Sequence, residues 1–435
     1  MNVDCYTDMM MRKEHTYHWR QRLLAGWMAI GACLYPTLVQ GQIDKWLKVS
    51  GMENIRCTEV EGTTYACFED NQYRSTYQGI GRAIEACLSQ PLKGDLQLVV
   101  LEERVPRLCI TLPHELAEAY RKGEADLKQV YSRMGISIET DEPMQVLQAS
   151  GAKEQKSSTW KTDLVIYPSL FLENNTFDEL YTYAVNLNPT LEMELWKGAR
   201  LAAQVIVPVV TNLSGEMNRV RPGIVAVTQE ARFRNNWFGR ISAGNFTNNR
   251  YGVQVEAKHR SRDGRIEVGG VIGSTGFSAL TKEDGWYMGR KQRINASVNA
   301  SYYEPTWNLE LKVRAGRYVY GDFGVRGDCI RHFGENSIGV YALTTGGKIN
   351  GGFYFAVPWP GKRWKRNGFF RIKPADYFAW NYGMVAHGEY VEKRMEREYN
   401  VRPNENASSR FYQPDYIRYF LVKTQKSKQE QLNDK

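Results

Sequence analysis

Residues 181–210 read YTYAVNLNPTLEMELWKGARLAAQVIVPVV and carry the strongest structural signal in the chain. Apolar side chains such as Val185 and Leu187 alternate with polar ones such as Asn186, and this period of two is typical of a β-strand with one apolar face. The alternation resumes after the turn at 196–198. The two runs therefore predict a long hairpin.

The same alternation of apolar and polar residues recurs further along the chain. Residues 293–302 and 307–315 alternate on either side of a turn at 304–306, which predicts a second long hairpin. Weaker alternation runs through residues 225–233, 253–259, 266–272, 338–342 and 353–357. Together these segments predict on the order of a dozen strands.

The length of the strands favours a membrane protein. Strands in globular proteins usually have about 5–6 residues, whereas a tilted strand that spans a bilayer needs about 9–11. Aromatic residues at strand ends fit interfacial girdles, and they are Trp196, Tyr302, Tyr303, Trp307, Tyr318 and Tyr320. We expect a mainly β protein with an antiparallel β-barrel of the outer-membrane type. A large soluble sandwich or open sheet with one buried face is the alternative.

Polar residues alternate with the apolar face, and in a barrel they would line or plug the lumen. The candidates are Glu192, Glu194, Arg200, Gln204, Glu310, Lys312 and Arg314.

The beginning of the chain resembles an export signal. Basic residues precede an apolar run at 23–39 that Gly and Pro interrupt, and small residues follow, so we predict a signal peptide over residues 1–41. An uncleaved anchor is the alternative. A lipobox reading would make Cys33 a lipidated residue.

Between the signal and the strands the pattern is mixed. A helix at 79–88, short strands at 97–101 and 108–112, and one helix from Pro113 to Met134 predict a small α/β domain over residues 42–139. A polar linker is expected at 140–159, the barrel at 160–422 and a polar tail at 423–435. Export would place the α/β domain in the periplasm.

Four cysteines fall within this α/β domain: Cys57, Cys67, Cys87 and Cys109. An oxidising compartment permits disulfides, and Cys57 and Cys67 flank a turn at a separation that suits a hairpin. Burial as small apolar side chains is the equal alternative.

The composition of the 435 residues, 42% hydrophobic and 24% charged, excludes collagen-like and largely disordered classes. A basic cluster at Lys362, Arg363, Lys365 and Arg366 is a candidate patch for lipopolysaccharide or an acidic polysaccharide, although most such clusters are solvated surface. Nucleic acid is not an expected partner, since no recognition motif is present.

Catalytic fingerprints are missing from the sequence. The pairs Glu192/Glu194 and Glu256/Glu267 are the only carboxylates that glycoside hydrolysis would suggest, and lumen-facing charge explains them better. We therefore expect no enzyme, no metal site and no cofactor, and we keep a hydrolase as the third hypothesis.

Two segments resemble the YjbH-like exopolysaccharide-biosynthesis outer-membrane proteins. They are GRYVYGDFGVRGDCIRHFGENSIGVYALTTGG at 316–347 with GGFYFAVPWP at 351–360, and GNFTNNRYGVQVEAKHRSRDGRIEVGGVIGSTG at 244–276. The resemblance implies an outer-membrane β-barrel, often lipidated, that works with machinery for making or secreting a polysaccharide. It brings no catalytic residues.

The leading hypothesis is therefore a barrel in the outer membrane of a Gram-negative bacterium that assists production or secretion of an extracellular polysaccharide. Its expected partners are membrane lipid, lipopolysaccharide, the polysaccharide and other export components. The runner-up is a soluble periplasmic or surface β-protein that binds carbohydrate.

Overall fold

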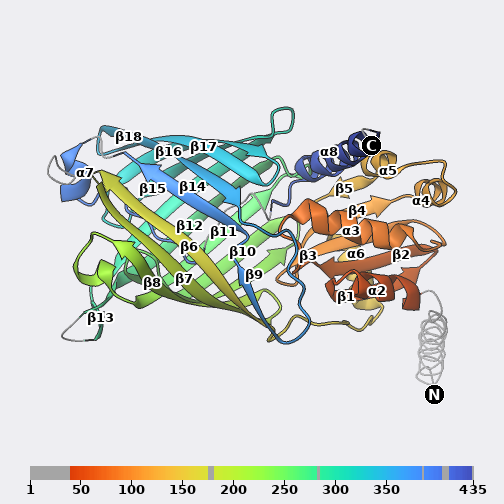
Figure 1. Ribbon diagram of the computed structural model, residues 1–435, viewed down its shortest axis with the longest axis horizontal. Helices are drawn as coiled ribbons and strands as arrows, with labels where there is room; N and C mark the ends of the chain where they lie inside the picture. Colours follow the sequence, from red (N-terminus) through yellow and green to blue (C-terminus); the bar gives the residue numbers. More distant parts are fainter. Residues whose placement is uncertain (1–39, 175–180, 282–284, 385–386, 404–410, 434–435) are drawn as a thin grey trace, which may run out of the picture.

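The computed structural model of the protein describes residues 40–174, 181–281, 285–384, 387–403 and 411–433. The predicted lipidation site Cys33, and all of the predicted signal peptide except its last two positions, lie outside these residues. Two units make up the described chain, a small α/β unit and a large curved sheet, and the α/β unit lies at one end of that sheet (Figure 1). The predicted mainly β architecture is confirmed.

The α/β unit contains α2 (Gln40–Val49), β1 (Glu53–Val60), β2 (Thr63–Glu69), α3 (Thr76–Leu88), β3 (Leu96–Glu102), β4 (Val105–Leu112), α4 (His114–Arg121), α5 (Leu127–Arg133), β5 (Gly135–Ser137) and α6 (Asp141–Ala149). Its sheet has the order β1-β2-β3-β4-β5. Strands β2 and β3 are parallel and are connected through α3, whereas the other neighbours are antiparallel.

Both faces of this small sheet are buried. Ile84 of α3 and Leu98 of β3 belong to the main core on one face. Leu147 of α6 packs with Val99 on the other face. Because β3 is covered on both sides, its sequence LQLVVLE is almost continuously apolar instead of alternating.

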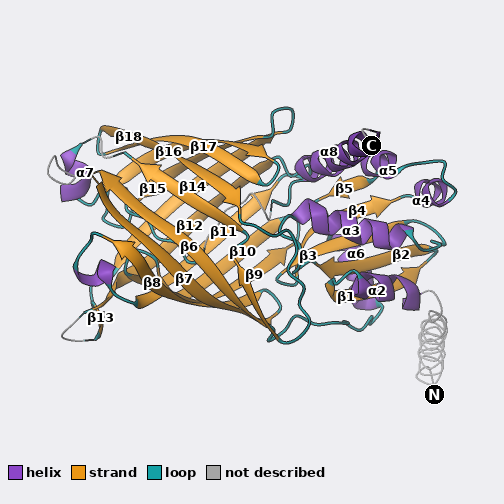
Figure 2. Cartoon of the chain, in the orientation of Figure 1, coloured by secondary structure: helices purple, strands orange, loops and turns teal. Residues whose placement is uncertain are grey.

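The large sheet contains β6 (Thr162–Asn174), β7 (Tyr181–Trp196), β8 (Ala199–Thr211), β9 (Arg221–Phe233), β10 (Trp237–Phe246), β11 (Arg250–Arg260), β12 (Ile266–Leu280), β13 (Trp286–Met288), β14 (Arg293–Glu304), β15 (Leu309–Arg317), β16 (Phe323–Phe333), β17 (Asn336–Thr345), β18 (Lys348–Pro358), β19 (Phe370–Pro374) and β20 (Tyr377–Gly383). The short helices η2 (Gly215–Asn218) and α7 (Gly388–Glu392) lie outside it, and α8 (Pro414–Asn433) ends the described chain. Figure 2 shows most of the strands in the large sheet, and most of the helices beside the smaller sheet of the α/β unit.

Neighbouring strands of the large sheet are antiparallel from β6 to β12 and from β14 to β18, and β12 pairs directly with β14. The two predicted hairpins are confirmed as β7 with β8 and β14 with β15. At the two ends of the strand order lie β19 and β20, which are consecutive in the chain. β19 pairs in parallel with β6, and β20 pairs in antiparallel fashion with β18.

Each long strand has one apolar and one polar face. In β11, Val253 and Val255 are 45% and 47% exposed, and both lie outward. Their neighbour Glu256 lies on the opposite face and pairs with Arg240 of β10 at 3.1 Å. The charged residues therefore occupy the inside of the curve and the aliphatic residues the outside.

The C-terminal helix belongs to the α/β unit, which differs from the predicted boundary at 422/423. Tyr416, Ile417, Phe420 and Leu421 of α8 are buried in the main α/β core. Figure 1 shows α8 beside α5, far along the sequence from it. The boundary predicted from hydropathy fell inside α8, between its apolar first half and its polar second half.

Two further predictions for this region were wrong in detail. The expected linker at 140–159 contains α6, whose Leu147 is fully buried. The single helix expected after Pro113 is two helices, α4 and α5, because Gly123 adopts a left-handed backbone with φ of 76° and Asp126 begins a new helix with a capping box. Among the helices of the described residues, none has the length and apolar character needed to cross a membrane.

Candidate functional site

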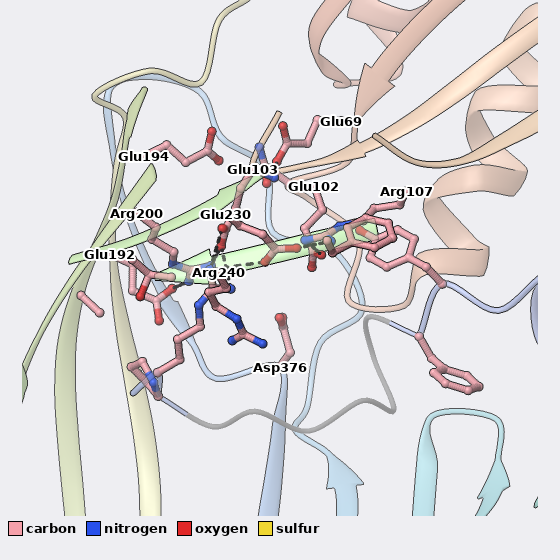
Figure 3. Close-up of a pocket in the computed structure, with 18 of the residues that line it drawn as sticks. Glu69, Glu102, Glu103, Arg107, Glu192, Glu194, Arg200, Glu230, Arg240 and Asp376 are labelled. Carbon is pink, nitrogen blue, oxygen red and sulfur yellow. Dashed lines mark hydrogen bonds and ion pairs between the residues drawn. The ribbon is translucent and has the colours of Figure 1, made fainter. Parts of the chain in front are cut away.

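A cavity of about 430 Å³ lies where the α/β unit meets the large sheet. Carboxylates and Lys or Arg side chains line it in nearly equal numbers. In Figure 3, Arg107 enters from the α/β unit, whereas Glu192 and Arg200 come from strands of the sheet. The cavity is thus formed by both units.

The tight turn between β3 and β4 inserts the α/β unit into the sheet. Its two central residues, Glu103 and Arg104, have φ of 51° and 62°, the left-handed pair that a two-residue hairpin turn requires. The backbone N–H of Gly198 donates to the carbonyl of Glu103 at 2.8 Å, and the N–H of Glu230 donates to the carbonyl of Gly198 at 2.7 Å. A side chain at Gly198 would collide with the Glu230 carbonyl oxygen, so only glycine fits there.

Glu103 is the centre of an ion-pair network. Its carboxylate lies 3.0 Å from the Arg200 guanidinium and 2.9 Å from that of Arg402. Burial by itself would raise the pKa of the Glu103 carboxyl, but Arg402 and Arg200 lower it below its usual value of 4.5. Glu103 is therefore ionised at neutral pH and attracts cationic groups from two other parts of the chain.

A second group of contacts joins β4 to the sheet. Arg107 forms ion pairs with Glu230 of β9 and, at 2.8 Å, with Glu102. Its guanidinium also lies 5.6 Å from the ring centre of Phe238. Since both Arg107 and Glu230 are almost fully buried, these contacts connect the two units where water has little access.

Most of the predicted lumen-lining residues lie on the inner, polar face. Glu192, Glu194, Arg200, Glu310 and Lys312 all border the cavity. Within that set, Glu192 pairs with Arg200, and Lys312 lies 3.1 Å from Glu310.

The other two predicted lumen residues have separate surroundings. Gln204 is buried, and its amide donates to the hydroxyl of Thr190 at 2.9 Å. Arg314 pairs with Glu398 at 2.7 Å, away from the cavity.

The predicted basic patch is divided by the fold. Arg366 is buried and pairs with Asp163 at 2.6 Å and with Glu53 at 3.2 Å. Arg363 lies over the ring of Tyr73 at 5.0 Å. Lys362, Arg363 and Lys365 are exposed, so only the buried Arg366 is withdrawn from the predicted surface patch. The segment instead holds the sheet against the α/β unit.

Of the two alternatives for Cys57 and Cys67, a disulfide or burial as small apolar side chains, the structure shows burial. Cys57 lies opposite Ala66 in the β1–β2 ladder, so Cys57 and Cys67 point to opposite faces of the small sheet. Cys87 shares the core of Cys57, and Cys109 shares that of Cys67. No disulfide joins any of the described cysteines. Burial raises the pKa of the Cys109 thiol to about 12, which makes it unreactive.

The carboxylate pairs considered for hydrolysis each have basic or hydroxyl partners. Glu192 accepts a hydrogen bond from the Tyr167 hydroxyl at 2.6 Å, and Glu194 accepts one from Ser158. Glu256 pairs with Arg240 and Glu267 with Lys258. Within the described ranges, no three His, Cys, Asp or Glu side chains converge in a way that would hold a metal ion. Ionised groups of both signs line the cavity and can form charge-assisted hydrogen bonds.

Sequence reasoning missed two elements of the site. The turn at Glu103 and Arg104 lies between two short strands in LEERV, which is a hairpin signal, but nothing local indicates its distant partners. Arg402 lies in a segment without periodicity and reaches the cavity only through tertiary folding.

Comparison with known proteins places these features in context. A family model described as "Exopolysaccharide biosynthesis protein YbjH" matches residues 35–354, which include the α/β unit and most of the large sheet. Searches of the curated proteins and of the solved structures find no match. The match is longer than the segments from which the resemblance was inferred.

Proposed function

We propose that this chain, which belongs to the YjbH family of exopolysaccharide biosynthesis proteins as its sequence predicted, forms a β-barrel in the outer membrane of a Gram-negative bacterium. In this proposal it assists production or secretion of an extracellular polysaccharide. The α/β unit lies in the periplasm, where it meets other export components.

The apolar outer face of the large sheet is the observation that carries the proposal. Ile272, Val298 and Val313, from three different strands, are 62%, 66% and 54% exposed. Such a continuous aliphatic surface is rare on soluble proteins, since water opposes its exposure. Lipid tails would cover it, whereas the inner face carries the ion pairs.

The height of this surface fits a bilayer. Strand β11 has 11 residues. At about 3.4 Å per residue and a tilt of roughly 35–45°, such a strand spans roughly 26–31 Å along the barrel axis. The apolar band of outer-membrane barrels is about 25 Å tall, so β11 is long enough to cross it.

Exposed aromatic residues follow the end of the sheet that faces the α/β unit, as an interfacial girdle requires. They are Trp196, Phe233, Trp237, Tyr302, Trp307 and Phe333. Tyr303 and Tyr318, which the sequence suggested for such a girdle, are buried instead. Tyr303 packs against Phe411 and Tyr416.

Closure of the sheet into a barrel is supported by residues 370–383. The first part of this segment, β19, pairs with β6, and the second part, β20, pairs with β18. Between them the backbone N–H of Ala375 donates to the carbonyl of Ile166 at 2.9 Å. One segment thus supplies the strands at both ends of the strand order, which supports a closed sheet, because membrane lipid would not tolerate exposed strand edges.

The test places one charge on each face of the same strand. Val255→Arg puts a cation toward lipid, at a cost of about 2–4 kcal/mol near the bilayer centre, whereas Gln254→Arg points inward. We expect the first variant to lose the outer-membrane fraction and the faster gel migration of the unheated protein, and the second to keep both. Release of the wild-type protein by osmotic shock would instead support a soluble carbohydrate-binding protein.

The role in polysaccharide production is tested separately. Strains that carry the wild-type gene, a deletion or the Val255→Arg allele are compared for extracellular polysaccharide. We expect the deletion and the membrane-defective allele to lose polymer to the same extent. Normal polymer with the Val255→Arg allele, in cells where that protein is absent from the membrane, would contradict a membrane-based role.

A further inference from the structure

Residues 394–402, here called the strap, return the chain across the inside of the large sheet. Strand β20 ends at Gly383, and α7 follows at the end of the sheet remote from the α/β unit (Figure 1). Helix α8 then packs at the opposite end, against the α/β unit. The described residues 394–402 therefore begin the return of the chain from the remote end of the sheet.

The first part of the strap is bound to the turns at the remote end. The N–H of Glu396 donates to the carboxylate of Asp322 at 2.8 Å, and the N–H of Val319 donates to the carbonyl of Arg397 at 3.2 Å. The N–H of Thr247 donates to the carbonyl of Asn400 at 3.1 Å. These bonds reach the β15–β16 turn and the β10–β11 turn, so the strap extends across that opening.

The side chains of the strap occupy the polar interior. Glu398 pairs with Arg314 of β15, and the Tyr399 hydroxyl donates to Asn295 of β14 at 3.0 Å. The Tyr399 ring also stacks on Phe246 at 5.3 Å between centroids. Val401 is buried in a small apolar cluster with residues of β9 and β10.

Arg402 ends the strap and attaches it to the α/β unit. Its guanidinium lies 2.9 Å from Glu103 in the β3–β4 turn and 3.8 Å from Glu230 of β9. The same Glu103 also pairs with Arg200. A movement of the α/β unit away from the sheet would therefore remove the main ionic partner of Arg402.

The strap contributes no strand to the sheet. Residues 396–400 lie outside every helix and strand. The contacts above are hydrogen bonds, ion pairs, one ring stack and the packing of Val401 in a small apolar cluster. Each such contact contributes about 0.5–3 kcal/mol, so the strap can be released without opening the strand ladder.

We propose that the strap is a displaceable internal plug that closes the remote opening, with Arg402 as its latch to the α/β unit. The proposal rests on the barrel proposed above, because a plug has meaning only in a closed lumen. An export partner that draws the α/β unit away from Glu230 would release the latch and open a path for a polymer chain.

The test compares conductance in planar lipid bilayers. In one variant, residues 394–402 are replaced by a Gly-Ser sequence of equal length, which keeps α8 connected. We expect low conductance for the wild type and an increase of about tenfold or more for this variant, because a barrel of more than eight strands leaves a wide lumen once it is unplugged. Lys393→Ala is the matched control, because Lys393 pairs only with the exposed Glu389 among the described residues, and it should behave as the wild type.

The plug and the barrel can be contradicted separately. Equal conductance of wild type and replacement variant, both inserted, would contradict the plug and leave the barrel intact. Failure of the wild type to insert and to migrate faster on unheated gels would contradict the barrel, and the plug with it. If the replacement does not fold, Glu398→Gln with Arg402→Met keeps the strap backbone, and unchanged conductance of that double variant would also contradict the plug.

Discussion

Arg107 is the residue whose loss should weaken the junction of the two units most. Arg107 lies on β4 of the α/β unit, and its side chain pairs with Glu230 on β9 of the large sheet. The two side chains are only 8% and 6% exposed. Arg107→Met keeps most of the apolar stem but removes the charge. Glu230 would then retain Arg402, at 3.8 Å, as a distant partner. Removing one partner of a buried ion pair lowers the free energy of unfolding by about 3–5 kcal/mol, since the remaining charge stays desolvated.

Urea unfolding of the protein in detergent micelles measures this cost, with proteolysis at the junction as a probe of the α/β unit. Arg121→Met is the control, because Arg121 forms an exposed pair with Glu118 within α4 and should change stability by at most about 0.5 kcal/mol. The double variant with Glu230→Gln should cost less than the sum of the single variants, because it no longer leaves a buried carboxylate at position 230 without its Arg107 partner. A loss for Arg107→Met no larger than that of the control would refute the reasoning.

Three further outcomes are expected. The pKa of Glu103 is lowered in the folded protein. The contribution of Glu103 to stability is therefore present above its unfolded pKa of about 4.5 and is lost as the pH falls through the folded pKa. Glu103→Gln should accordingly flatten the acid limb of a plot of melting temperature against pH. Gly316→Ala places a methyl group 2.3 Å from a backbone oxygen of β14 and should cost about 1–3 kcal/mol in urea unfolding, whereas Gly327→Ala, whose nearest neighbour is 4.0 Å away, should cost far less. Leu421→Ala should destabilise the α/β unit by about 2–5 kcal/mol and expose α8 to protease, whereas the half-exposed Tyr419 tolerates the same change.

Each of these predictions has a contrary result. An acid limb unchanged in Glu103→Gln would mean that other carboxylates carry the acid sensitivity. Equal losses for the two glycine variants would show that the β14–β15 approach is no tighter than its neighbours. Protease resistance of Leu421→Ala would contradict the docking of α8 as the closing element of the α/β core.

The long hairpins could be predicted because their signal is local. In β7 and β8 the alternation of apolar and polar residues follows directly from the geometry of a strand. The same alternation placed Glu192 and Arg200 on the polar face, where they border the cavity. The boundaries were less accurate, since α8 is apolar only over its first half and one of its partners in the α/β unit, Met134, is 284 residues away from Arg418 in sequence.

The cysteines and the basic cluster show where local reasoning fails. Spacing brought Cys57 and Cys67 near each other along a hairpin, but one residue of register sends them to opposite faces. Arg366 was indistinguishable in the sequence from the exposed Lys365, although it is buried between two carboxylates.

By itself, the sequence of this protein determined the strand period, the strand length and the family, because each of these depends on residues close together in the chain or on a continuous match to relatives. Only the tertiary structure decided which charges meet at the junction, where α8 packs and what crosses the inside of the sheet. Ion pairs such as Arg402 with Glu103 join residues far apart in sequence, and their formation depends on the global path of the backbone, which no local pattern encodes.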